Sequence, residues 1–248
     1  MSTKLVGYTT YLLGGRAYKK ICFPPEKLKM NDHVKGNGKF CPALTNIFKN
    51  TYVIRSPFDL HLRIEKTPNN TWWVEVLPDS SLQPNQFNNI FSINGLDDQN
   101  NKDWPLLQMN FPYTFISDDD VYLETLPPLL EYNKVPGVIL AGTFSIRDWH
   151  RRYNWGFEWR DTSKNLVIKR GDPISYIRFN PVNRNDKIKL REIHMTDDIK
   201  EAMDCSEIKD LTKTSMQELM DHNGKYRKRR LIKSHLRYIL DRFISRIN

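Results

Sequence analysis

Arginine and aromatic side chains are concentrated in one stretch, RDWHRRYNWGFEWR, which runs from Arg147 to Arg160. Guanidinium groups hold phosphates and aromatic rings stack on bases or sugars, and proteins that bind single-stranded nucleic acid use both. A strand over residues 154–160 would put three aromatic rings on one face, and Tyr153 just before it would add a fourth. Such a row is better explained as a core face, so Arg151 and Arg152 are the stronger candidates. The predicted contact residues in this stretch are Trp149, His150, Arg151, Arg152, Trp155 and Arg160.

A second predicted contact is the run KYRKRR, which begins at residue 225. Residues 225–248 carry nine basic side chains against one acid, whereas the rest of the chain carries 29 basic and 28 acidic ones. Eight units of the formal charge of +9 at pH 7 therefore belong to the last tenth of the chain. Cations gathered in this way attract a polyanion such as nucleic acid. The predicted contact residues in the run are Lys225, Arg227, Lys228, Arg229 and Arg230.

A continuous apolar stripe at helical spacing follows the basic run over residues 231–247. A helix with this pattern suits the phosphates of a nucleic acid, an anionic membrane surface, or an apolar patch on the body or on a second subunit. Acidic segments precede the stripe, and their opposite charge favours packing within the same chain. The stripe consists of Leu231, Ile232, His235, Leu236, Ile239, Leu240, Phe243, Ile244 and Ile247.

Motifs of the common enzyme classes are missing from the sequence. None of the six histidines is followed two residues later by Asp or Glu, as the facial-triad oxygenases require. No phosphate-cradling glycine loop and no GxSxG motif occurs. Asp118, Asp119 and Asp120 are consecutive, which suits a solvated turn better than a cation site. We predict no catalytic residue, no metal and no cofactor, and we leave open whether the protein is an enzyme.

Cysteine usage and hydropathy limit the compartment. Cys22, Cys41 and Cys205 are odd in number and form no CxxC pair, which is typical of reduced thiols. No apolar run reaches the roughly 18 residues of a membrane-spanning helix, and the first residues lack the apolar region of a secretion signal. We expect a soluble, unsecreted protein without a transmembrane segment.

The elements that must position these residues are mostly strands. From Tyr52 to Met195 the apolar residues recur with a period of two, and turn residues interrupt them. The segments FDLHLRIE and TWWVEV, joined by TPNN, predict a hairpin. Residues 83–103 are rich in Asn, Gln and Asp and predict a long loop. Further strands are expected at residues 106–115, 122–126, 138–146, 154–160, 166–169, 174–179 and 188–194.

Helices are expected only after residue 195. Thr196 suits the N-cap of a helix whose first turn holds Asp197 and Asp198, and a capping box at Ser215 begins a second helix before the basic amphipathic one. Many short strands without intervening helices predict a mainly β fold, either an antiparallel β-sandwich or an open barrel of the jelly-roll kind. The expected division is a β body over residues 1–195 and a helical segment over residues 196–248.

Two stretches of the sequence together resemble a known family. CPALTNIFKNTYVIRSPFDLHLRIE spans residues 41–65, and GTFSIRDWHRRYNWGFEWRDTSKNLVIKRGDPISYIRFN spans residues 142–180. Their order resembles an uncharacterised family encoded by tailed phages of the marine cyanobacterial type. The resemblance covers residues 40–195 and carries no catalytic residue. It implies a phage origin and hence a location in the host cytoplasm or in the virion.

These observations favour a non-enzymatic phage accessory or assembly protein. It would bind nucleic acid or another polyanion, or a phage or host protein, through the Arg and Trp surface and the basic C-terminal helix. Two alternatives stay open. One is an enzyme or small-ligand binder with an aromatic and Arg pocket at a sheet end, in which His150 carries protons. The other is a virion structural subunit, a homo-oligomer that self-associates through the last helix.

Overall fold

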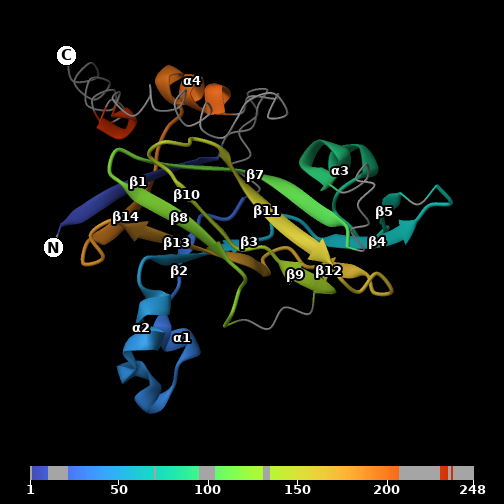
Figure 1. The fold of residues 1–248 in the computed structure, drawn as a ribbon, viewed down its shortest axis with the longest axis horizontal. Coiled ribbons are helices and arrows are strands. Elements are labelled where there is room, and N and C mark those ends of the chain that lie inside the picture. Colours follow the sequence, from blue (N-terminus) through green and yellow to red (C-terminus); the bar gives the residue numbers. More distant parts are fainter. Residues whose placement is uncertain are drawn as a thin grey trace.

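Three curled β-sheets make up most of the computed structural model, so the prediction of a mainly β fold is confirmed (Figure 1). The sheets form a half-barrel, which corresponds to the open-barrel form of that prediction. The structure describes residues 2–10, 22–69, 71–94, 104–130, 135–206, 230–233 and 236.

The largest sheet has six strands in the order β14-β1-β7-β11-β9, with β6 also paired to β7. Strand β14 pairs with β1 in parallel, and it lies at the edge of the sheet. The strands are β1 (Thr3–Thr10), β6 (Phe91–Asn94), β7 (Leu106–Ser117), β9 (Gly137–Ile139), β11 (Arg152–Trp159) and β14 (Lys187–Glu192).

The two smaller sheets are antiparallel. The five-stranded sheet has the order β10-β8-β13-β3-β2, and the three-stranded sheet has the order β12-β4-β5. The first contains β2 (Glu26–Lys27), β3 (Thr51–Arg55), β8 (Val121–Leu126), β10 (Gly142–Ser145) and β13 (Pro173–Pro181). The second contains β4 (Leu60–Lys66), β5 (Trp72–Val76) and β12 (Leu166–Ile168).

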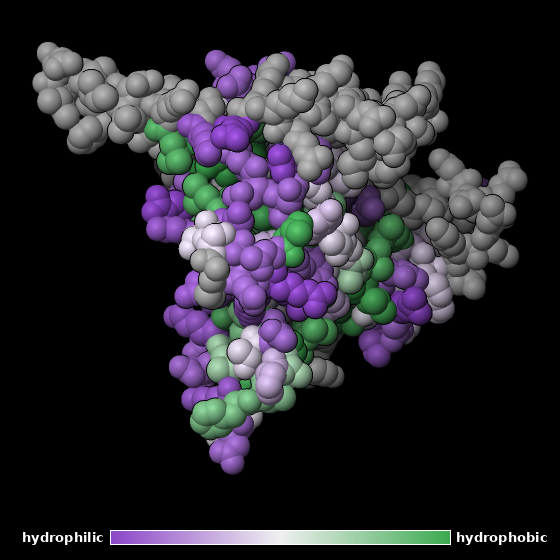
Figure 2. Space-filling view, turned by 60° about the vertical axis from the view of Figure 1, so that its left-hand side comes forward, coloured by the Kyte–Doolittle hydropathy of each residue, from purple (hydrophilic) through white to green (hydrophobic). Residues whose placement is uncertain are grey.

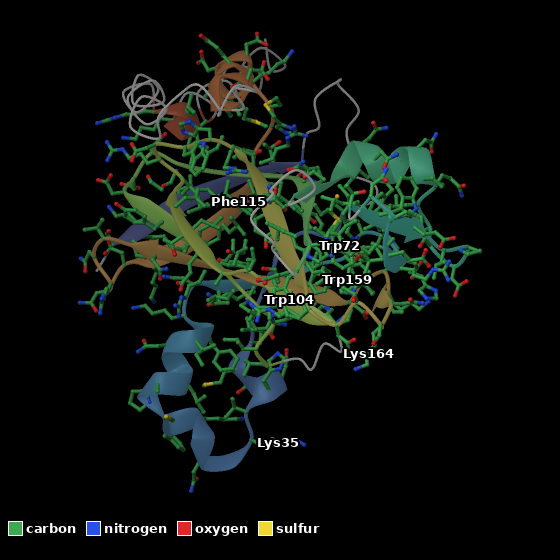
Figure 3. All side chains as sticks on the ribbon, turned by 45° about the vertical axis from the view of Figure 1, so that its right-hand side comes forward. Lys35, Trp72, Trp104, Phe115, Trp159 and Lys164 are labelled. Carbon is green, nitrogen blue, oxygen red and sulfur yellow. The ribbon has the colours of Figure 1, made fainter. Side chains whose placement is uncertain are left out.

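One hydrophobic core lies between the inner faces of these sheets. It follows from the period-two pattern, because alternate side chains of a strand point to opposite faces. In β4, for example, Leu60, Leu62 and Ile64 are buried in this core. Figure 3 shows Phe115 and Trp159 inside the body, whereas Lys35 lies near the tip of a helical projection.

That projection is built from α1 (Met30–His33), the 3-10 helix η2 (Gly36–Phe40) and α2 (Pro42–Phe48), none of which was predicted. It extends from the body on the side opposite α4 (Figure 1). Its base packs on the outer face of the five-stranded sheet through a second core cluster that contains Leu28, Phe48, Val53 and Tyr176.

The predicted loop over residues 83–103 is wrong for its first part, because α3 (Pro84–Ile90) and β6 occupy residues 84–94. Pro84 stands in the first turn of α3, and Gln83 and Gln86 form a capping box there. Phe87 and Phe91 stack with ring centroids 4.5 Å apart and are buried, so two apolar residues outweigh the polar composition. The predicted strand 138–146 is two strands, β9 and β10.

Helix α4 (Asp197–Ser206) begins where the sequence predicts a helix, and the Ile199 amide donates to Thr196 Oγ1 at 3.3 Å. Residues 231–233 are helical, and a cluster on the outer face of the six-stranded sheet unites them with α4. The helix predicted from Ser215 lies outside the described residues. Among the helices that the structure describes, none is both long and apolar enough to span a membrane.

Candidate functional site

The aromatic row of β11 faces the interior. Trp155 is 1 % exposed, and its indole N–H donates to the backbone oxygen of Ile174 at 3.0 Å. Tyr153, Phe157 and Trp159 are buried beside it, which confirms the interpretation of the row as a core face. Trp155 therefore lies away from the surface that the sequence analysis assigned to it, because burying the four rings stabilises the sheet.

The loop between β10 and β11 contains the predicted contact residues Trp149 and His150, and it is held by polar and aromatic contacts. Ser145 Oγ donates to Asp148 Oδ2 at 2.8 Å, and Trp149 meets the Phe144 ring edge-on at 5.6 Å between centroids. His150 is buried, and burial lowers its pKa to about 4, an effect that Asp148 partly opposes. A buried, neutral imidazole does not suit the role of a proton carrier for a bound ligand.

The predicted arginines occupy opposite ends of β11. Arg151 lies over the Trp149 ring at 4.6 Å, and Arg152 begins the strand. Arg160 follows its far end, where it pairs with Glu158 at 3.2 Å and approaches the Trp104 ring at 5.9 Å. Eight residues of strand separate the two groups by about 25 Å. The structure thus does not bring Arg151, Arg152 and Arg160 together in one contact surface.

The end of the basic run is fixed to the body by an aspartate. Arg230 is exposed and has a positive φ of 49°, and the helical turn begins directly after it. The amides of Ile232 and Lys233 donate to the two carboxylate oxygens of Asp118 at 3.1 and 3.0 Å. A carboxylate at a helix N-terminus satisfies its free N–H groups and suits the helix dipole. The other predicted residues of the run, Lys225, Arg227, Lys228 and Arg229, lie outside the described part of the chain.

The rest of the acidic triplet also has structural partners. Asp119 pairs with Lys4 at 3.2 Å, and Asp120 pairs with Arg147 at 2.7 Å. The carboxylates of this turn therefore bind a helix end and two separate cations.

Sequence reasoning overlooked the cations of β14. Lys187, Lys189 and Arg191 alternate with Ile188 and Leu190, which pack against the main core. The three cations are exposed on the opposite face, and none makes an ion pair with a residue that the structure describes. The signal was present as the alternating pattern KIKLRE.

A polar groove lies between the end of α2 and the end of β13, with a volume of about 470 Å³. Lys49 Nζ donates to the backbone oxygen of Arg184. Arg178 Nε and Asn180 Nδ2 both donate to Glu124 Oε2 at 2.8 Å. The lining residues are Asn46, Lys49, Asn50, Arg178, Phe179, Asn180, Pro181, Val182 and Arg184.

The groove and the β14 cations are joined at the β13–β14 turn. Arg184 lies in this turn and Lys187 begins β14, while the Ile188 amide donates to Asn50 Oδ1 at 3.2 Å. The turn carries the chain from β13, the central strand of the five-stranded sheet, to β14 at the edge of the six-stranded sheet. It lies on the side that Figure 2 brings forward, where hydrophilic residues predominate. We call the six cations of this path the basic tract: Lys49, Arg178, Arg184, Lys187, Lys189 and Arg191.

A second cleft, of about 360 Å³, lies between α3 and the β12–β13 turn. Phe58, Leu82 and Ile90 give the cleft an apolar lining, and Arg170 also lines it. Arg170 lies over the Phe23 ring at 4.7 Å, and its Nε donates to the backbone oxygen of Pro57 at 3.2 Å. None of the predicted Arg and Trp contacts lines this cleft.

Comparisons with protein-family models, with curated proteins and with solved structures find no match for the chain. The features that can mark a site in this chain are its charge and its geometry. On these grounds the basic tract is the strongest candidate site, because it combines a groove, several cations and an anchored neighbouring segment.

Proposed function

We propose that the protein binds nucleic acid through the basic tract and acts as a non-enzymatic accessory or assembly protein. One observation carries the proposal: six cations follow one path, and five of them make no ion pair with a described acid. The exception is Arg178, which pairs with Glu124 at 2.7 Å. Unpaired cations in a row attract the phosphates of a polyanion and release their counterions when it binds.

Protection of a sheet edge explains only part of this arrangement. Charged residues on an edge strand prevent it from pairing with another chain, which accounts for Lys187, Lys189 and Arg191. Lys49 and Arg184 lie off that edge, in the groove, where no unpaired strand needs protection. Binding of an anion accounts for both halves of the tract.

The place where the chain meets the body directly after the C-terminal basic run supports the same proposal. Leu231 and Ile232 are 2 % exposed and pack in one cluster with Leu5 of β1. Leu5 is the cross-strand neighbour of Lys189. The run that ends at Arg230 therefore reaches the body beside the β14 cations, so that both can contact one polyanion.

A phage origin remains part of the proposal, since it rests on the resemblance of residues 40–195. In that setting the nucleic acid would be phage DNA or RNA, met in the host cytoplasm or in the virion. The nucleic acid, rather than a protein partner, is favoured by the charge of the tract.

The test is a fluorescence-anisotropy titration with labelled oligonucleotides at two salt concentrations. The wild-type protein should bind with an affinity that falls steeply with salt, and the variant K187E/K189E/R191E should bind at least about tenfold more weakly. K35E/K39E/K169E is the matched control, because it changes the net charge equally at exposed lysines outside the tract. Equal losses in both variants, or affinity that ignores salt, would overturn the proposal.

A further inference from the structure

An exposed tyrosine stands next to the groove of the basic tract. Tyr122 of β8 is 45 % exposed and is the cross-strand partner of Asn180, which lines the groove. Paired residues of neighbouring strands point to the same face of the sheet, so the Tyr122 ring and the Asn180 amide lie side by side. An aromatic ring beside cations is the combination on which single-stranded nucleic acids stack.

The charge inside the groove is arranged so that two cations remain for a ligand. Glu124 accepts hydrogen bonds from Arg178 and Asn180, and it thereby fixes both side chains in the groove wall. Its charge is offset by Arg178, which leaves Lys49 and Arg184 as the excess positive charge. The Lys49 ammonium is held at the turn by the backbone oxygen of Arg184, so the two cations stay close together.

Amide groups supply the remaining polar contacts. Asn46, Asn50 and Asn180 line the groove, and the amide donors and acceptors that are not already bonded within the protein can meet the edge of a base. Asn50 is fixed by its positive φ of 54° and by the hydrogen bond from Ile188 to its Oδ1, which leaves its amide nitrogen as a donor. An αL backbone is tolerated by Asn better than by most residues.

We infer that this groove holds a single-stranded segment of nucleic acid, with a phosphate at Lys49 and Arg184 and a base stacked on Tyr122. The inference rests on the proposed function and narrows its ligand class. A volume of about 470 Å³ accommodates a ligand of nucleotide size. A duplex keeps its bases stacked inside, so it would reach the cations but not the tyrosine ring.

The experiment compares a labelled 12-nucleotide oligo(dT) with a labelled duplex of the same length. We expect the wild-type protein to bind the single strand more tightly. Y122A should weaken single-strand binding about 5- to 150-fold, the range found when one stacking residue is removed, and should change duplex binding less than about twofold. Y122F should bind like the wild type, because it keeps the ring.

Two further variants make the result specific. W73A removes another exposed ring, 60 % exposed on β5 and outside the tract, and should leave both affinities unchanged. K49A/R184A should weaken binding of both probes, because a duplex also reaches these cations. Thermal unfolding of each variant checks that the fold is kept.

The outcomes separate the inference from the proposed function. Salt-sensitive binding with equal affinity for both probes, and no effect of Y122A, would overturn the single-strand groove and leave the proposed function standing. Absence of salt-sensitive binding to either probe would overturn both. A loss in Y122A confined to the single strand would support both.

Discussion

His150 illustrates how burial decides the part that a titratable residue can play. It lies in the arginine-rich stretch that the sequence marks as a contact, yet its ring is inside the protein. Burial penalises the imidazolium and lowers the pKa of His150 to about 4, although the nearby Asp148 carboxylate acts in the opposite direction. The ring is therefore neutral at pH 7 and adds nothing to the attraction of a polyanion.

The lowered pKa of His150 predicts a pH dependence of stability. An unfolded histidine titrates near 6.5, so between pH 6.5 and about 4 the unfolded state binds the additional proton. The free energy of unfolding should consequently fall as the pH drops through this window, by at most about 3 kcal/mol from this residue, and the contribution should be constant above pH 6.5. Urea unfolding of the wild type and of H150Q at several pH values measures the difference. If the difference in unfolding free energy between the wild type and H150Q did not change with pH, the lowered pKa of His150 would be contradicted.

The strands β9 and β10 both begin at a glycine, but only at β9 does a neighbouring backbone leave no room for a side chain. Strand β9 begins at Gly137, which pairs with Trp159 of β11. A Cβ atom at Gly137 would lie 2.0 Å from the backbone oxygen of Glu158, a distance that only a shift of the strand relieves. At Gly142, the first residue of β10, the nearest atom would be Thr125 Oγ1 at 3.7 Å.

The two glycines therefore make a matched pair of substitutions. G137A should lower the free energy of unfolding by at least about 2 kcal/mol, because overpacking against backbone cannot be relieved by a rotamer change. G142A should change it by less than about 1 kcal/mol, since an ordinary contact is all that the new methyl group makes. Denaturant unfolding of both variants provides the measurement. Similar losses of unfolding free energy in the two variants would show that β9 shifts at little cost, which would contradict the prediction.

Strands with one buried face were the easiest to locate from the sequence, whereas β1, which has two covered faces, was not located. Strands β4 and β11 show a clear alternation because only one side of each meets the core. In β1 the residues from Val6 to Thr9 are all buried, so the alternation disappears. The helices between residues 30 and 48 are each seven residues or fewer, too short to show a period of 3.6 residues.

The candidate site was less accessible to sequence reasoning than the fold. Its groove joins residues 46–50 to residues 178–184, and only the pairing of β3 with β13 brings these segments together. The cations of β14 could have been recognised from their alternation with apolar residues. The Arg and Trp stretch was misleading as a surface because its rings serve the core and its arginines lie at opposite strand ends.

The positive charge of the C-terminal segment and its attachment to the body are separable. Five of the nine basic residues lie in the run before residue 231, whereas Leu231 and Ile232 provide the buried anchor. Deleting residues 225–248 would therefore remove both and expose the cluster beneath α4. Neutralising the run alone is the cleaner change.

We expect K225Q/R227Q/K228Q/R229Q to keep the stability of the wild type and to bind nucleic acid with a weaker salt dependence. Each phosphate contact on a single strand contributes about 0.7 to the slope of log affinity against log salt, so loss of four contacts lowers that slope by about 3. Anisotropy titrations over a range of salt concentrations measure it, and thermal unfolding serves as the control. An unchanged slope would mean that the run does not touch phosphates.

The parallel pairing of β1 with β14 also governs when the protein can finish folding. Thr3 is aligned with Lys187, so β1 has no neighbour on that side until the ribosome has made more than 180 further residues. At 5–20 residues per second this takes about 10–40 s, during which one edge of β1 stays unpaired. Pairings so distant along the chain slow folding as well. During this interval a chaperone, or a strand from another copy of the chain, can pair with the edge of β1 that β14 later covers.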